Sequence, residues 1–127
     1  QAFYEVIRSS SGDAVHALVG QLEALESPSS QDQVYLGALY MRMADFQKVP
    51  AQKLASFKQG RDLLEQEIEK QPKEVEFRFV RMIIQEQAPA FLKYNGELEA
   101  DKGMVLEALD MMEPELKKEV ELYLQRH

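Results

Sequence analysis

The sequence contains no cysteine and only two histidines, His16 and His127. Without cysteine the chain cannot form disulfides, zinc–thiolate sites or a thiol nucleophile. His16 lacks a carboxylate or a second histidine at the spacing that a metal site or a catalytic pair requires, so we interpret it as a surface or boundary residue. His127 is the last residue, where chains usually fray. We therefore expect no metal and no cofactor.

Long apolar runs are also missing. The longest, from Val34 to Met41, has eight residues, whereas a helix needs about 20 apolar residues to cross a bilayer. We expect no membrane span.

Catalytic motifs are missing as well, because the sequence has no glycine-rich phosphate loop and no nucleophile elbow. Carboxylates are plentiful, but general acid/base chemistry needs one of them in a perturbed environment within a cleft, and these runs are typical of solvated helix faces. They are Glu65, Glu67 and Glu69, Glu97 and Glu99, and Glu113 and Glu115. The sequence predicts that the protein is not an enzyme.

Basic residues are fewer than acidic ones. The sequence has 15 basic and 22 acidic residues, which gives a net charge of -7. The closest basic pair, Lys117 and Lys118, is followed by Glu119 and Glu121. Because a negative surface repels nucleic-acid phosphates and anionic lipids, we expect neither as a partner.

What the sequence does have is helical periodicity along most of its length. A chain of 127 residues with 45% hydrophobic content fits one folded domain, residues 1–127. No stretch shows the sustained alternation of a half-buried strand, so the predicted fold is all-α.

Turn residues set the expected helix limits. Ser9-Ser10-Ser11-Gly12, Pro28, Pro50, Pro72 and Asn95-Gly96 are the main interruptions. The first predicted helix covers 2–8, and the second is capped by Asp13 and ends near Ser27. The third, over 31–47, is expected in the middle of the stack. The others are 51–70, 74–87, a short helix over 89–94, 98–112 and 114–126.

The helix over 74–87 has an unusual face. At 100° per residue, Glu74, Arg78, Arg81 and Gln85 fall within a strip about 60° wide, and nearly all its other residues are apolar. We expect the apolar residues to be buried and the strip to be the only edge in contact with water.

Arg78 and Arg81 are the best functional candidates. Two adjacent guanidinium groups suit a carboxylate or phosphate of a partner. Pairing within the protein is the other interpretation, with Glu74 for Arg78 and either Asp45 or Asp101 for Arg81. Both interpretations are open at this point.

A second candidate is the apolar cluster of Phe91, Leu92 and Tyr94 beside the Asn95-Gly96 turn. It either covers the core or lines a partner groove, and core cover is the favoured interpretation.

Part of the sequence resembles the tetratricopeptide repeat, a unit of two antiparallel helices. Leu36-Gly37 followed by Tyr40 is similar to the signature of its first helix, in which the glycine allows close packing of the second. Gly12, Ala17, Ala24, Leu25 and Pro28 resemble the small-residue spacing and terminal proline of its second helix. The resemblance implies stacked antiparallel helix pairs in a right-handed superhelix of about seven or eight helices.

A longer stretch resembles an uncharacterised family of small exported bacterial proteins. The shared positions are Leu54, Phe57, Gly60, Leu64, Pro72, Phe77-Arg78-Phe79-Val80-Arg81, Gln85, Pro89, Leu92 and Tyr94. Members of that family carry a signal peptide, which implies a periplasmic or secreted protein with Gln1 at or near a mature terminus. A cytoplasmic location is the alternative.

These features favour a non-enzymatic module that binds a protein or peptide partner on a surface of stacked helices. Arg78, Arg81, Tyr40 and Tyr94 are the predicted partner contacts. The alternative is a carrier of a small ligand or lipid, in which apolar residues of the helices over 31–47 and 74–87 line a cavity. An enzyme that uses the acidic groups ranks last.

Overall fold

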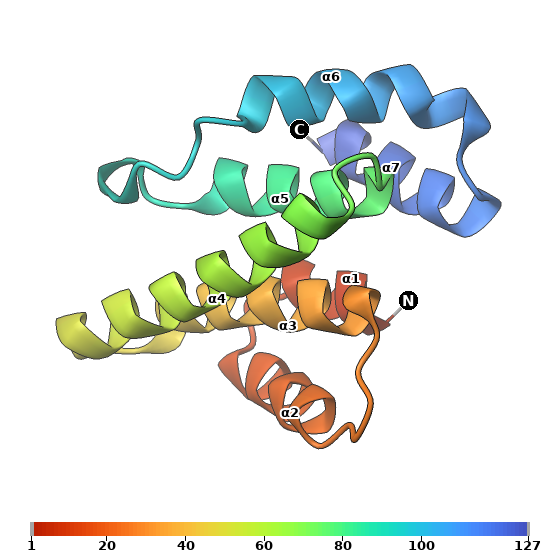
Figure 1. The fold of residues 1–127 in the computed structure, drawn as a ribbon. Helices are drawn as coiled ribbons and strands as arrows, with labels where there is room; N and C mark the ends of the chain where they lie inside the picture. Colours follow the sequence, from red (N-terminus) through yellow and green to blue (C-terminus); the bar gives the residue numbers. More distant parts are fainter. Residues whose placement is uncertain (1, 127) are drawn as a thin grey trace. The chain divides into compact units, whose positions relative to one another are not determined.

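The computed structural model describes residues 2–126, which form seven α-helices and three short 3-10 helices. No strand occurs in this range, so the all-α prediction is confirmed. The chain divides after Gln71 into two compact units, and each is described by itself. Figure 1 follows the chain through both.

The first unit contains four α-helices. These are α1 (Ala2–Arg8), α2 (Gly12–Glu23), α3 (Ser30–Met43) and α4 (Pro50–Lys70), with η1 (Ala44–Phe46) between the last two. Helix α3 packs against α1, α2 and α4, and it lies alongside α4 in Figure 1. Within this unit α3 has a central place, because it contacts the other three α-helices and buries Val34, Ala38 and Leu39 completely.

Helix starts in this unit follow the chemistry of their capping residues. The Ser29 hydroxyl accepts from the Asp32 backbone N–H at 3.0 Å, and the Asp32 carboxylate accepts from the Ser29 N–H at 2.9 Å, which completes a capping box. Helix α2 differs from the prediction, because Ser11 is its cap and Asp13 is not. Ser11 accepts from the Ala14 N–H at 3.1 Å, and Asp13 lies in the first turn, where its charge suits the helix dipole.

Two glycines allow α3 and α4 to cross closely. A Cβ atom on Gly60 would collide with the Gly37 carbonyl oxygen and would lie 2.8 Å from the Met41 nitrogen. A Cβ on Gly37 would lie 2.9 Å from the Gly60 carbonyl oxygen. The expected close approach at Gly60 is confirmed, and Gly37 is its counterpart.

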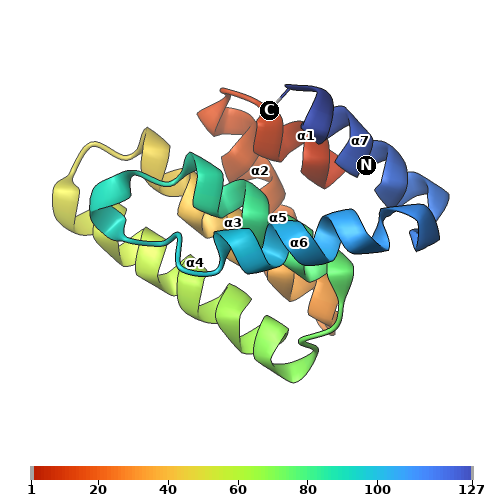
Figure 2. The same ribbon diagram turned by 90° about the horizontal axis from the view of Figure 1, so that it is seen from above.

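The second unit contains the other three α-helices. These are α5 (Val75–Gln87), α6 (Leu98–Ala108) and α7 (Pro114–Arg126), with η2 (Ala90–Leu92) and η3 (Leu109–Met111) as connecting turns. Figure 2 shows α6 running back along α5 after the connection through η2. The helix expected over 89–94 is a single 3-10 turn, and the one expected over 98–112 changes to 3-10 geometry at Leu109.

Helix α5 buries the apolar residues expected of it. Phe77, Val80 and Ile84 are each less than 5% exposed. No described helix is both long and apolar enough to cross a bilayer. Within residues 2–126, no cluster of three or more histidine, aspartate or glutamate side chains could hold a metal ion.

Candidate functional site

The most concentrated polar structure of the second unit is centred on Asp101 in the first turn of α6. This carboxylate has no exposed surface. Arg81 of α5 binds it with two hydrogen bonds, from Nε to Oδ2 at 2.7 Å and from Nη2 to Oδ1 at 2.8 Å. The pair therefore has the bidentate geometry that makes arginine–carboxylate contacts strong.

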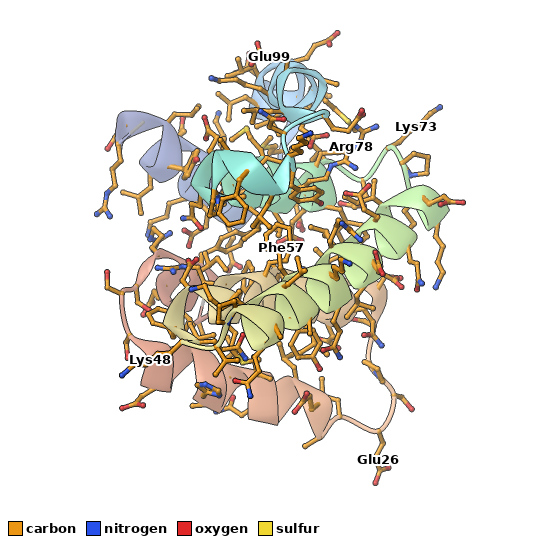
Figure 3. The ribbon with its side chains drawn as sticks, turned by 90° about the vertical axis from the view of Figure 1, so that its left-hand side faces the viewer. Glu26, Lys48, Phe57, Lys73, Arg78 and Glu99 are labelled. Carbon is orange, nitrogen blue, oxygen red and sulfur yellow. The ribbon has the colours of Figure 1, made fainter. Side chains whose placement is uncertain are left out.

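Two more side chains of α5 complete what we call the Asp101 network, defined as Arg78, Arg81, Gln85 and Asp101. Arg78 donates from Nη1 to Asp101 Oδ1 at 2.9 Å, and Gln85 donates from Nε2 to Oδ2 at 2.8 Å. Spacings of three, four and seven residues place the three donors on one face of α5. Figure 3 labels Arg78 on that helix and Glu99 on α6.

The network also organises the backbone at the start of α6. The Glu97 backbone N–H donates to Gln85 Oε1 at 3.0 Å, and Arg78 Nε donates to the Pro72 carbonyl oxygen at 3.1 Å. One glutamine side chain thus connects Asp101 to the N-terminal end of its own helix. Such a connected network fixes α5 and α6 in one register.

The strip is only in part the water-facing edge that we expected, because Glu74 is exposed and Arg81 and Gln85 are buried. Arg81 and Gln85 are each only 4% exposed, because the strip faces Asp101. Arg81 pairs with Asp101, one of its two expected partners, whereas Asp45 binds Arg42. Arg78 binds Asp101 and not the expected Glu74. A carboxylate of the protein itself therefore occupies the predicted anion clamp.

A pocket of about 350 Å³ lies beside this network, at the C-terminal end of α5. Its size is at the lower end of the range for ligand pockets. The loop through η2 forms one wall, and Lys93 ends that turn in a left-handed conformation with φ 55°. The lining residues are Gln85, Glu86, Ala88, Pro89, Ala90, Tyr94, Asn95 and Leu98. Of the four predicted partner contacts, Tyr94 is the one that lines this pocket.

Glu86 is the charged residue of the lining. Its Oε1 atom accepts a hydrogen bond from the Tyr123 hydroxyl of α7. Burial of Tyr123, and then the nearby Glu86 carboxylate, raise the pKa of the Tyr123 hydroxyl, so this group remains a protonated donor at neutral pH. Tyr123 therefore fixes the position of a carboxylate that keeps its second oxygen as an acceptor.

The remaining predicted residues lie elsewhere. Tyr40 belongs to the first unit, is 7% exposed and donates its hydroxyl to Glu23 Oε2 at 2.5 Å. Phe91 is 80% exposed, so the prediction that its cluster covers the core is wrong for this residue. His16 is exposed as expected, and His127 lies outside the described residues.

Sequence reasoning missed the pocket although it found the signals that border it. Pro89 and Asn95-Gly96 mark the two ends of the connection between α5 and α6. The missed lining residues, Gln85 and Glu86 among them, come together only when α6 folds back along α5. Comparison of the chain with protein-family models, curated proteins and solved structures finds no match.

Proposed function

We propose that the protein is a non-enzymatic module that binds a peptide or protein partner, and that the pocket at the C-terminal end of α5 receives a side chain of that partner. The observation that carries this proposal is the pocket itself, with a volume of about 350 Å³. Ala88, Pro89, Ala90 and Leu98 offer apolar surface, and Glu86 and Asn95 add polar groups that fix orientation.

The mixed lining favours a side chain over an acyl chain. A lipid carrier requires a mostly apolar enclosure, because each polar group left unpaired against a hydrocarbon tail costs about 1–3 kcal/mol. Four of the eight lining residues, Gln85, Glu86, Tyr94 and Asn95, carry polar groups in their side chains, and Glu86 is charged. Native mass spectrometry of the purified protein tests the carrier alternative, which a co-purifying lipid-sized adduct would support.

The same lining argues against an enzyme. General acid/base hydrolysis uses two carboxyl groups with different environments. Glu86 is the single carboxylate of the lining, and Asp101 is held by Arg78, Arg81 and Gln85.

We extend the proposal to architecture and location. The pairs α3 with α4 and α5 with α6 are consistent with a tetratricopeptide-like superhelix, and the Gly37–Gly60 approach suits the resemblance carried by Leu36-Gly37 and Tyr40. Export to the periplasm or beyond rests on the resemblance to exported bacterial proteins. A signal peptide in the full-length reading frame, followed by recovery of the protein outside the cytoplasm, would support it.

A display selection with the intact chain tests the binding proposal. Peptides enriched from a random library are measured by calorimetry against the wild type and against Ala90→Leu, which adds bulk to the pocket wall. We expect Ala90→Leu to weaken binding about tenfold, roughly 1.4 kcal/mol. Ala24→Leu makes the same change at an exposed residue of the first unit and should bind like the wild type. Failure to enrich any peptide, or equal binding by Ala90→Leu, would overturn the proposal.

A further inference from the structure

The electrostatics of the pocket specify which side chain it takes. Glu86 is the acidic residue of the lining, and none of the eight lining residues is basic. Tyr123 holds that carboxylate through one oxygen only. A cation entering the pocket would therefore meet a positioned acceptor and no competing positive group from the lining.

The end of α5 adds to this negative potential. The C-terminal end of a helix carries about half a negative charge, because its last carbonyl groups have no partner within the helix. Basic residues often neutralise that end, but the last turn of α5 contains none. Gln85 and Glu86 of this turn, and Ala88 immediately after it, all line the pocket.

Nearby positive groups do not cancel this potential. Arg78 and Arg81 share the Asp101 carboxylate, and Arg81 Nη2 also lies 4.0 Å from Glu97 Oε1, so two carboxylates face the two guanidinium groups. The N-terminal end of α6 carries Glu99 and Asp101 in its first turn, and the Glu97 backbone N–H beside it is bonded to Gln85. Lys93 is exposed and does not belong to the lining.

We propose that the pocket binds a lysine or arginine side chain of a peptide partner, an inference that rests on the proposed binding function. The charged head reaches Glu86 and the carbonyl end of α5. Its aliphatic stem packs on Pro89, Ala90 and Leu98. Tyr94 adds an aromatic ring, a favourable surface for a cation.

The aliphatic part of the lysine or arginine side chain distinguishes this ligand from other ligands. A free small amine would satisfy Glu86 but would leave the apolar wall of Ala88, Pro89, Ala90 and Leu98 uncovered. A norleucine side chain would cover the wall without compensating the carboxylate. Lysine and arginine do both, and the net charge of -7 favours their approach.

The test is an NMR titration of the intact, isotope-labelled chain with capped Ala-Lys-Ala, its arginine analogue and its norleucine analogue. We expect the two basic peptides to shift the amide signals of residues 85–98, with the norleucine peptide at least about fivefold weaker, which corresponds to roughly 1 kcal/mol. Glu86→Gln keeps an acceptor for Tyr123 and removes the charge, so it should weaken the lysine peptide by a similar factor. Glu107→Gln makes the same change at an exposed residue outside the lining and should leave the affinity unaltered.

Each other outcome contradicts a defined part of the inference. Equal shifts with the norleucine peptide would overturn cation recognition while leaving a peptide-binding pocket intact. Methylammonium that binds as well as the lysine peptide would show that the stem contributes nothing and would overturn the choice of a peptide side chain. If no peptide shifts residues 85–98 while display-selected peptides bind in an Ala90-dependent way, the charge inference alone fails.

Discussion

At the scale of single residues, Asp101 is the centre of the buried polar network of the second unit. Its two oxygens accept four hydrogen bonds from Arg78, Arg81 and Gln85 while no part of the residue is exposed. A buried ion pair of this kind contributes little net free energy when intact, because desolvation offsets attraction. Its removal is costly, because the partner charge stays buried without compensation.

We therefore expect Asp101→Asn to destabilise the protein by about 3–5 kcal/mol, since Arg81 would be left buried beside a neutral amide. Urea unfolding followed by circular dichroism measures the loss. Asp110→Asn makes the same change at an exposed aspartate of the same unit and should alter stability by less than about 0.5 kcal/mol. Equal stability of the two variants would show that the network is not buried as described.

Tyr40 leads to a prediction about pH. Burial, and then the hydrogen bond to Glu23 and the charge of that carboxylate, raise its pKa from 10.0 to about 12. Below pH 10 the hydroxyl is protonated in both folded and unfolded states, so its contribution to stability is fully present. Between pH 10 and about 12 the unfolded state loses this proton while the folded state keeps it, so stability falls as pH rises.

Absorbance at 295 nm across this pH range follows tyrosine ionisation directly. The wild type should show a late-titrating tyrosine that Tyr40→Phe lacks, and the loss of stability above pH 10 should be smaller in that variant. An unchanged titration curve in Tyr40→Phe would contradict the assignment. Tyr123, whose pKa is also raised, remains in both proteins.

The sequence predicted which residues form the Asp101 network better than it predicted their burial and pairing. Helical spacing placed Arg78, Arg81 and Gln85 on one strip, and Asp101 was one of two carboxylates proposed for Arg81. Periodicity gives the direction of a side chain around its own helix but not the neighbour that the side chain faces. The choice between Asp45 and Asp101, and hence the burial of the strip, depended on how α6 folds back.

At the scale of elements, α3 and α4 cross closely because Gly37 and Gly60 have no side chain at the crossing point. Gly60→Ala would bring a Cβ against the Gly37 carbonyl oxygen and the Met41 backbone, neither of which is a flexible side-chain end. The helices would have to separate, which costs about 1–3 kcal/mol and outweighs the roughly 1 kcal/mol gain in helix propensity.

The matched control is Gly20→Ala in α2, where an added Cβ meets nothing within 4 Å. This variant should be more stable than the wild type by about 0.5–1 kcal/mol, because alanine favours the helix at no steric cost. Thermal unfolding of the two variants should therefore shift in opposite directions. A stabilised Gly60→Ala would disprove the close crossing.

Helix limits were predictable where proline sets them and less so where tertiary contacts do. Pro50 and Pro114 each open a helix within one residue of the predicted start. The end of α6 at Ala108 carries no such signal, since the residues after it keep an apolar, helix-compatible pattern while the backbone tightens to a 3-10 turn. Pattern alone does not separate these two geometries.

At the scale of the whole molecule, the excess of acidic residues has consequences for association. A net charge of -7 spread over 127 residues attracts basic partners over distances up to about the Debye length, roughly 10 Å at 0.1 M salt. The sequence fully determines this charge, but only the fold shows that one of the acidic residues, Glu86, lines a pocket. Glu86 is one of 22 acidic residues, and it differs from the others in its place between the end of α5 and the Tyr123 hydroxyl.

The negative electrostatic potential of the protein predicts how binding of the capped Ala-Lys-Ala peptide depends on salt. Raising sodium chloride from about 20 mM to about 500 mM shortens the Debye length from roughly 20 Å to below 5 Å, so the affinity should fall several-fold. The norleucine analogue, which has no charge to screen, should bind equally at both concentrations. Glu86→Gln should retain a weaker salt dependence, because the other acidic residues still attract the peptide while the short-range contact is lost. If binding of the lysine peptide to the wild type is insensitive to salt, attraction between the acidic residues and the cation does not contribute to the affinity. Glu86 would then not be the group that recognises the cation.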